Sequence, residues 1–254
     1  MTDSTQNTQT LAVITGASSG MGLATAHKVA EQGCHKLYLI AKTADKLQQA
    51  ADQLRQTFPK ATVETVTIDV GDTNAVRTAF ATICSQEEKI DYLLLAAGIS
   101  ESENLAESHD TKGFEHDIQV NLTGMYACLL YAKPCLKPGS SVVTIASIRG
   151  QTPSPSGLGY AASKSGVISL TQASALQLGP VGVRVNCISP GAVYPTGMSA
   201  HWGAEKRQRI ADDSPLGKLT TPEDIANAAW FFFSDESRAI TGQTLNCNAG
   251  DFMS

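Results

Sequence analysis

The chain has 254 residues, a length that suits one large α/β domain or two small ones. Hydrophobic residues make up 42% of it and charged residues 17%, so it can bury a sizeable core. The net charge of −5, without a basic stripe, argues against a nucleic-acid partner. The polar start and the lack of a long apolar run predict a cytoplasmic protein without a membrane partner.

Apolar strand-like runs alternate with helix-like stretches along the chain. We expect strands at Leu11–Thr15, Lys36–Ala41, Thr62–Ile68, Tyr92–Ala96, Ser141–Ala146, Arg184–Ile188 and Thr244–Cys247. We expect helices at about Gly22–Glu31, Ala44–Phe58, Thr73–Ser85, Phe114–Leu136, Tyr160–Leu178 and Pro222–Ser234. This alternation predicts a three-layer α/β fold, with a doubly wound parallel sheet of seven strands and helices on both faces.

No linker-like stretch divides the chain, so we expect one domain over residues 9–254, preceded by a flexible tail at residues 1–8. Ligands of such sheets bind beyond the carboxyl ends of the strands. The residues that follow each strand therefore carry most of the functional signal.

The first strand leads into a glycine-rich turn of the form Gly-x-x-x-Gly-x-Gly, followed by a helix. A strand that turns sharply into a helix N-terminus leaves backbone N–H groups free to bind a phosphate, and glycines permit its close approach. This turn predicts a dinucleotide site that includes Gly16, Ser18, Ser19, Gly20, Met21 and Gly22. The alternative is a turn that only closes a strand onto a helix.

The end of the second strand indicates which dinucleotide is bound. NAD sites normally place Asp or Glu there, to bind the ribose 2′-hydroxyl. Here Ala41 is followed by Lys42 and Thr43, which favour a 2′-phosphate; the alternative is an ordinary solvated lysine. We therefore expect NADP(H) to be preferred and NAD(H) to remain usable.

Two further strand ends are expected to contact the cofactor. Asp69, followed by Val70, ends the third strand and can accept from the adenine amino group or cap the next helix. Ala97 and Gly98 end the fourth strand, where small side chains let the backbone pass close to the cofactor or let two strands approach.

A chemical site is predicted from Ser147, Tyr160 and Lys164. The four-residue spacing puts Tyr160 and Lys164 on one helical face, where an ammonium lowers the pKa of a phenol towards working pH. Such a phenol suits general acid/base chemistry, and the Ser147 hydroxyl can hold a carbonyl oxygen beside it. Asn121, in the long Phe114–Leu136 helix, can support a water that leads from Lys164 to solvent.

In combination and order, these residues resemble the classical short-chain dehydrogenase/reductase family, in its 3-oxoacyl-acyl-carrier-protein reductase-like branch. The resemblance covers almost the whole chain, including Pro190-Gly191 after the sixth strand. It implies a Rossmann fold, commonly assembled as a tetramer, and a catalytic set of Asn121, Ser147, Tyr160 and Lys164. It further implies that Tyr160 and Lys164 contact the nicotinamide half of the cofactor, together with Pro190, Gly191 and Val193.

Three departures from the family pattern accompany this resemblance. Leu95-Ala96-Ala97-Gly98 replaces the usual Asn-Asn-Ala-Gly, which puts local hydrogen bonding in question. Thr196 stands one residue late after the sixth strand, which leaves its contact with the nicotinamide carboxamide open. Asn248-Ala249-Gly250 replaces the frequent Asp-Gly-Gly.

The substrate loop is expected at about residues 194–214, as a lid. Candidate substrate contacts are Arg149, Gln151, Met198 and Trp202. For Arg149 the alternative is solvation, and for Met198 and Trp202 it is packing of the lid on the body. The six cysteines and five histidines show no metal-ligand spacing, so no metal is expected.

Three functions compete at this stage. The first is NADPH-dependent reduction of a ketone or a 3-oxoacyl group, on a substrate that is either free or bound to a carrier. The second is oxidation of a secondary alcohol or dihydrodiol, and the third is a non-catalytic cofactor-binding sensor, which a broken catalytic set would favour. A homotetramer or homodimer is expected from the resemblance and from Trp230-Phe231-Phe232-Phe233, since four consecutive aromatics cannot all face one core from a helix.

Overall fold

The seven strands form a single parallel sheet. The computed structural model describes residues 9–101, 105, 108–153 and 157–253, so the predicted tail at residues 1–8 lies outside the described residues. The strands are β1 (Leu11–Thr15), β2 (Lys36–Ala41), β3 (Thr62–Thr67), β4 (Tyr92–Leu95), β5 (Ser141–Ile145), β6 (Arg184–Pro190) and β7 (Thr244–Cys247). Their order is β3-β2-β1-β4-β5-β6-β7, and every pair is parallel. The predicted doubly wound fold is confirmed.

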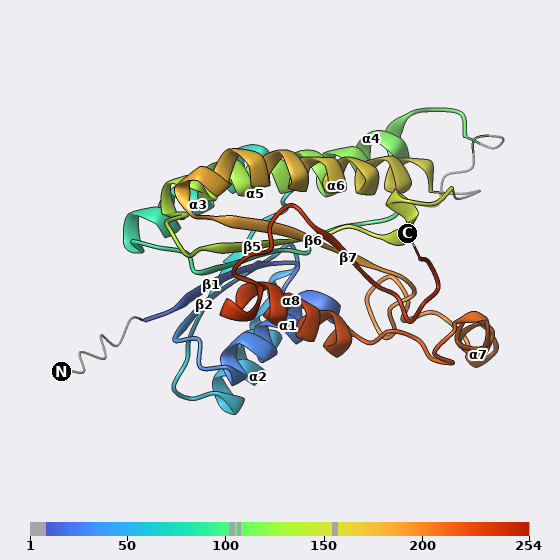
Figure 1. Ribbon diagram of the computed structural model, residues 1–254, viewed down its shortest axis with the longest axis horizontal. Helices are drawn as coiled ribbons and strands as arrows, with labels where there is room; N and C mark the ends of the chain where they lie inside the picture. Colours follow the sequence, from blue (N-terminus) through green and yellow to red (C-terminus); the bar gives the residue numbers. More distant parts are fainter. Residues whose placement is uncertain (1–8, 102–104, 106–107, 154–156, 254) are drawn as a thin grey trace.

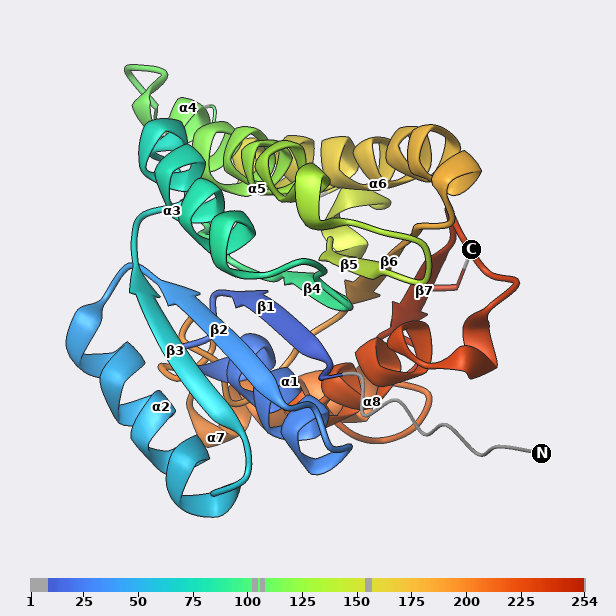
Figure 2. The ribbon, with the colours of Figure 1, turned by 90° about the vertical axis from the view of Figure 1, so that its left-hand side faces the viewer.

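Helices cover both faces of this sheet. They are α1 (Gly20–Glu31), α2 (Ala44–Thr57), α3 (Thr73–Gln86), α4 (Lys112–Ile118), α5 (Met125–Ala132), α6 (Leu158–Leu178), α7 (Ala204–Asp213) and α8 (Pro222–Phe233). Helices α3 to α6 lie over one face and α1, α2 and α8 over the other, as Figures 1 and 2 show. Helix α7 stands apart from both layers (Figure 1), within the loop expected to be a lid.

The predicted helix at Phe114–Leu136 is the largest difference from expectation. It is divided into α4, a π-helical segment at Gln119–Gly124, α5 and a short 3-10 turn at Lys133–Cys135. A Cβ on Gly124 would lie 2.4 Å from the carbonyl oxygen of Val70, so the backbone passes too close to β3's exit for a larger residue. Wider π-turns inside α-helices are frequent at functional sites, and this one contains Asn121.

Each face of the sheet has its own apolar cluster. Leu93, Leu95 and Val142 pack with Phe80 under α3 to α6. Ile14, Leu94 and Ile188 pack with Leu54 under α1, α2 and α8. Adjacent residues of β4 thus enter opposite clusters, as expected for a strand covered on both faces.

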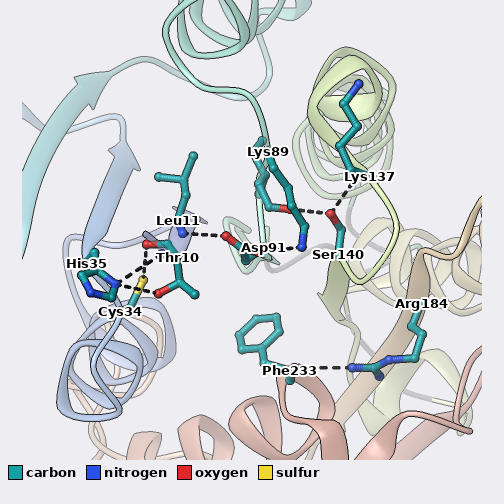
Figure 3. Close-up of polar contacts among 11 residues, drawn as sticks. Thr10, Leu11, Cys34, His35, Lys89, Asp91, Lys137, Ser140, Arg184 and Phe233 are labelled. Atoms are coloured by element: carbon teal, nitrogen blue, oxygen red, sulfur yellow. Dashed lines mark hydrogen bonds and ion pairs between the residues drawn. The ribbon is translucent and has the colours of Figure 1, made fainter. Parts of the chain in front are cut away.

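Polar contacts at the amino ends of the strands hold the edge of the sheet that is opposite the predicted site (Figure 3). Asp91 accepts from the Leu11 N–H at 2.8 Å and pairs with Lys89 at 2.8 Å. Arg184 at the start of β6 donates to the carbonyl oxygen of Phe233 at 3.4 Å. Protein side chains thereby occupy the amino ends of β1, β4 and β6, and the predicted ligand site lies at the opposite, carboxyl ends of the strands.

The aromatic run in α8 is mostly internal. Phe232 and Phe233 are buried, and Trp230 and Phe231 are partly buried against the same cluster. Tyr92 contacts the Trp230 ring at 5.6 Å and the Phe233 ring at 5.2 Å between centroids. Two of the four aromatic side chains, Trp230 and Phe231, thus keep part of their surface exposed, although α8 packs against both the sheet and α1.

Candidate active site

The glycine turn between β1 and α1 forms a cradle of bare backbone. Gly16 and Gly20 adopt φ values of +69° and +54°, which favour glycine. A Cβ on Gly22 would lie 2.3 Å from the Gly16 carbonyl oxygen, and a Cβ on Gly16 would lie 2.9 Å from the Ala97 nitrogen. Ser19 begins α1 without a side-chain cap, so the first N–H groups of that helix remain available to an anion.

Thr15 forms hydrogen bonds with the segment in which Leu95-Ala96-Ala97-Gly98 replaces the family's usual Asn-Asn-Ala-Gly. Its hydroxyl oxygen accepts from the N–H of Ala96 at 3.1 Å and of Ala97 at 3.2 Å. The end of β4 is therefore fixed beside the glycine turn by a residue of β1. Sequence reasoning missed this role, although Thr15 is the last residue of the strand that enters the turn.

Lys42 and Asp69, predicted to contact different parts of the cofactor, lie together. Lys42 Nζ is 2.9 Å from Asp69 Oδ2, and the Gly71 N–H donates to Asp69 Oδ1 at 2.9 Å. Burial acts to raise the pKa of Asp69, but Lys42 and the Gly71 N–H outweigh it, so the pKa is lowered and the group stays charged. Asp69 does not cap α3; Asp72 does, through the N–H groups of Asn74 and Ala75.

The segment after β6 returns over the glycine turn. A Cβ on Gly20 would lie 3.4 Å from Thr196 Cβ, and Thr196 is held by a 2.9 Å contact with the buried Ser199 hydroxyl. Gly191 abuts Asn248, where a Cβ would lie 2.8 Å from the Asn248 Cβ. Thr196 therefore sits against the glycine turn.

Tyr160 and Lys164 face each other from the first turns of α6. Lys164 Nζ is 5.6 Å from the centroid of the Tyr160 ring and donates to the Ile145 carbonyl oxygen at 2.9 Å. Lys164 is 3% exposed, so its ammonium is held between β5 and the tyrosine. A Cβ on Gly98 would lie 3.4 Å from Lys164 Nζ, so the segment after β4 passes close to the ammonium.

The proton affinities of this pair differ from the sequence-based expectation. Burial raises the pKa of Tyr160, and Asp117 adds to this, while the Ser147 hydroxyl and Arg149 act to lower it. Burial lowers the pKa of Lys164 to about 8. The pKa of Tyr160 is therefore raised in the chain itself and not lowered towards working pH as expected, because desolvation of the phenol outweighs the nearby charges.

Ser147 lies beside the Tyr160 phenol. Its hydroxyl oxygen accepts from the Arg149 N–H at 3.2 Å, and the same hydroxyl contacts the Tyr160 phenol. A Cβ on Gly150 would lie 2.6 Å from the Lys164 carbonyl carbon, so the Ser147 loop packs on the backbone of α6. The serine, the phenol and the ammonium are therefore brought into one cluster.

Asn121 holds the backbone next to that cluster. Its side chain accepts from the Ile99 N–H at 2.8 Å and donates to the Ile99 carbonyl oxygen at 2.9 Å. It also donates to Ser163 Oγ at 3.1 Å, and Ser163 donates to the Tyr160 carbonyl oxygen at 2.7 Å. All four predicted catalytic residues are thus connected, through Ser163 and the segment after β4.

The predicted substrate contacts separate into two kinds. Gln151 Nε2 donates to Ser189 Oγ and to Asn246 Oδ1, both at 2.7 Å, so its amide links the Ser147 loop to β6 and β7. Arg149 is exposed, and within the described residues its guanidinium has no ion pair or hydrogen bond, although its charge acts on the Tyr160 phenol. Arg149 is therefore free to meet a ligand.

The two predicted substrate contacts in the lid, Trp202 and Met198, differ in how far the lid itself covers them. Lys206 Nζ lies 4.6 Å from the centre of the Trp202 ring system, and Arg207 lies 4.7 Å from the Tyr194 ring centroid. These cation–π contacts join α7 to the segment before it. Met198 is 41% exposed. Trp202 thus has one face covered by the lid itself, while Met198 remains open.

Two other kinds of site were searched for in the part of the chain that the structure describes. No group of three His, Cys, Asp or Glu side chains there is arranged to hold a metal ion. No described helix is both long and apolar enough to span a membrane.

The chain is similar to known proteins over nearly its whole length. A family model described as enoyl-(acyl carrier protein) reductase matches residues 16–251. The chain is 28% identical over 244 residues to a 3-oxoacyl-(acyl-carrier-protein) reductase of Staphylococcus aureus, covering 95% of this chain and 98% of that protein. It is 31% identical over 242 residues to a cis-4-hydroxycyclohexanecarboxylate dehydrogenase of Sinomonas cyclohexanicum, covering 94% and 95%. The structure of a short-chain dehydrogenase from Burkholderia cenocepacia in complex with NADP superposes with a TM-score of 0.88 at 25% identity, covering 96% and 98%.

Proposed function

The chain belongs to the short-chain dehydrogenase/reductase family, whose members are oxidoreductases acting on CH–OH or C=O groups with NAD(P), and we propose that it reduces a ketone or 3-oxoacyl group with NADPH. The observation that carries this proposal is the cluster of Tyr160, Lys164 and Ser147 beside the glycine cradle. Its raised pKa keeps Tyr160 protonated at neutral pH, as a proton donor requires.

The residues at the strand ends fit a dinucleotide. The cradle has no side chain at Gly16, Gly20 or Gly22 where the diphosphate would lie, and the start of α1 is uncapped. We assign the diphosphate to the turn, the 2′-phosphate to Lys42 and Thr43, and the adenine to Asp69 and Val70. The nicotinamide half is assigned to Ala97, Gly98, Pro190, Gly191 and Val193, with Tyr160 and Lys164. When bound, the nicotinamide supplies or accepts the hydride.

The chain's own residues supply orientation and the proton. Ser147 donates a hydrogen bond to the substrate oxygen and holds it beside Tyr160. Tyr160 gives its phenolic proton to that oxygen in reduction, or takes it in oxidation. Lys164, charged below a pKa of about 8, stabilises the phenolate that remains. Asn121 keeps the backbone of Ile99 in place and supports the path of proton replacement.

Oxidation of a secondary alcohol is the second candidate function. It is favoured by the 31% identity to a dehydrogenase named for a hydroxycyclohexanecarboxylate. The exposed guanidinium of Arg149 also suits a substrate that carries a carboxylate or another anion. The lid at residues 194–214, with Met198 and Trp202, would cover the remainder of the substrate.

Assembly into a dimer or tetramer is part of the proposal. With the α8 aromatics mostly internal, the stronger support comes from exposed apolar side chains on α4 and α5: Phe114 is 42% exposed, Tyr126 50% and Leu130 42%. Tyr126 and Leu130 are four residues apart in α5 and so share a helical face, and exposed large apolar side chains of this kind are typical of association surfaces. Light scattering that shows a monomer at micromolar concentration would contradict this.

Turnover of a substrate panel tests the proposed activity. The panel contains 3-oxoacyl thioesters, cyclic ketones with and without a carboxylate, and the corresponding alcohols, each with NADPH/NADP⁺ and NADH/NAD⁺. We expect Tyr160→Phe to reduce turnover of the accepted substrate by at least about a hundredfold, the usual scale for loss of a general acid/base, while cofactor binding survives. Near-normal turnover by Tyr160→Phe would refute the assignment of Tyr160. Cofactor binding without turnover of any compound would favour the sensor alternative.

A further inference from the structure

Asp117 is a fully buried carboxylate at the edge of the catalytic cluster. It lies in α4 at 0% exposure, four residues before Asn121. Residues four apart share one side of a helix, and the two side chains bind the same stretch of chain. Asn121 holds the N–H and carbonyl of Ile99, and Asp117 accepts the Glu101 N–H at 3.2 Å to Oδ1 and 3.3 Å to Oδ2.

The segment held in this way lies close to Tyr160, with Gly157 between them. A Cβ on Gly157 would lie 3.6 Å from the Glu101 carbonyl oxygen and 3.7 Å from the Tyr160 Cβ. Helix α4 reaches α6 at the residue before the tyrosine: a Cβ on Gly159 would lie 3.1 Å from the Asp117 Cβ and 2.8 Å from the Phe114 Cα. Asp117 therefore touches both the segment after β4 and the first turn of the catalytic helix.

The negative charge of Asp117 is felt by both proton-exchanging groups. It adds to the effect of burial in raising the pKa of Tyr160, and it partly offsets the effect of burial on the pKa of Lys164. The other groups that act on the pair are the Ser147 hydroxyl and Arg149 from the loop after β5, and Cys187 from β6. His116 and Glu101 pair with each other at 3.0 Å on the half-exposed side of α4.

We propose that Asp117 is a positioning residue of the reaction, which anchors the segment after β4 near Tyr160 and places a buried negative charge beside the first turn of the catalytic helix. This inference rests on the proposed function of Tyr160 as the acid/base. The anchoring role and the electrostatic role have different requirements at position 117. Anchoring needs only a hydrogen-bond acceptor, whereas an effect on the pKa values of Tyr160 and Lys164 needs a negative charge.

Asp117→Asn separates these roles, since the amide oxygen still accepts the Glu101 N–H but the charge is gone. Removing a negative charge lets both Tyr160 and Lys164 lose protons more readily. In alcohol oxidation the rising limb of kcat/KM against pH is therefore expected to move to lower pH by roughly 0.5–1.5 pH units, the scale of one partly screened charge in a protein interior. Asp52→Asn, which removes an exposed carboxylate from α2, is the matched control and should leave the limb in place.

A spectroscopic titration makes the test independent of turnover. The ultraviolet absorbance of tyrosinate is measured against pH in the full-length protein and in Tyr160→Phe, and the difference reports Tyr160 alone. The same difference, taken with and without Asp117→Asn, should move to lower pH. If Asp117→Asn does not fold, Asp117→Ser carries the same test, since it also keeps an oxygen acceptor without charge.

The two failures can be told apart. Activity retained by Tyr160→Phe overturns the proposed function, and the tyrosinate titration still decides the inference about Asp117. An unchanged titration and an unchanged kcat/KM limb in a folded neutral variant overturn the inference about Asp117, whatever the activity of Tyr160→Phe. A shift of equal size in Asp52→Asn also overturns it, because the effect would then be that of net charge.

Discussion

The ammonium of Lys42 lies 2.9 Å from the carboxylate of Asp69, and these residues follow two neighbouring strands, β2 and β3. Their side chains are 69% and 36% exposed, so the ion pair contributes little to stability. Its consequence is for the proposed binding of NADP(H), because the carboxylate of Asp69 would compete with the 2′-phosphate for Lys42. The preference for NADPH over NADH is therefore expected to be modest.

Releasing Lys42 should strengthen that preference. We expect Asp69→Asn to raise the ratio of kcat/KM with NADPH to kcat/KM with NADH by about fivefold, and Lys42→Ala to lower it by a similar factor, as for one exposed charge contact. Any effect of the Asp69 substitution on adenine binding is common to NADPH and NADH, so it cancels in the ratio of the two kcat/KM values. Asp52→Asn serves as the control. A ratio that stays constant in Lys42→Ala would show that this lysine does not read the phosphate.

The buried Lys164 should make stability depend on pH. Its pKa is lowered by burial from 10.5 to about 8, so between these values the unfolded chain binds a proton that the folded chain does not. Below about pH 8 the buried ammonium therefore lowers the free energy of unfolding of the wild-type chain by its full amount, and this loss disappears as the pH rises to 10.5. Lys164→Met removes the ammonium. Its free energy of unfolding relative to wild type should therefore be highest at pH 7 and should fall by up to about 3 kcal/mol towards pH 10.5.

Urea unfolding at a series of pH values measures this difference. Loss of the hydrogen bond to Ile145 shifts the whole curve but not its dependence on pH. Lys112→Met, at an exposed lysine, provides the comparison and should give a difference that does not vary with pH. A flat difference for Lys164→Met would mean that Lys164 keeps an ordinary pKa in the folded chain.

The glycine cradle should not tolerate a methyl group at Gly22. A Cβ there would lie 2.3 Å from the Gly16 carbonyl oxygen, so Gly22→Ala must shift the turn. We expect a loss of about 1–3 kcal/mol in stability and at least a tenfold weaker cofactor affinity, measured by calorimetry. Gly179→Ala, where a Cβ meets nothing within 4 Å, should match wild type in both. Normal cofactor affinity in Gly22→Ala would place the diphosphate elsewhere.

Thr15 offers a test of the end of β4. Thr15→Val removes the oxygen that accepts from the Ala96 and Ala97 N–H groups and leaves both without this partner. We expect a loss of about 1–3 kcal/mol in the free energy of unfolding, the usual cost of an unmet partly buried polar group. Thr15→Ser retains the hydroxyl and should lose much less. Equal losses in the two variants would attribute the effect to packing of the methyl group.

Arg149 should discriminate between charged and neutral substrates. Its guanidinium is exposed and, in the described part of the chain, unpaired. If the accepted substrate carries a carboxylate, Arg149→Gln should raise its KM by roughly tenfold to a hundredfold, as for one charge-assisted contact, and should leave KM for the neutral analogue unchanged. Parallel changes in KM for both compounds would exclude anion recognition by Arg149.

Several features were predictable from sequence because the signals are local. The alternation of apolar runs and helical stretches predicted the parallel sheet, and all seven strands were placed to within two residues at each end. The glycine turn was predicted because φ values above zero and a close backbone approach leave no alternative residue. Tyr160 and Lys164 were paired because a four-residue spacing sets one helical face.

Other features depend on distances between parts of the chain that no local pattern relates. The Lys42–Asp69 ion pair, the Thr15 contacts with β4 and the link from Gln151 to β6 and β7 arise only when strands are stacked in their final register. The π-helical segment around Asn121 coincides with the close approach of Gly124 to Val70, which joins parts of the chain far apart in sequence. The raised pKa of Tyr160 is likewise tertiary, because burial acts on it from all the elements around it.

The residue types and their order in the chain thus determined by themselves the architecture and the set of side chains that we propose for proton transfer. The tertiary structure alone decided how those groups are charged and to which neighbours they are bound. The physical reason is range: helix and strand periodicity acts over a few residues, whereas desolvation and ion pairing depend on the packing of the whole sheet and its helices.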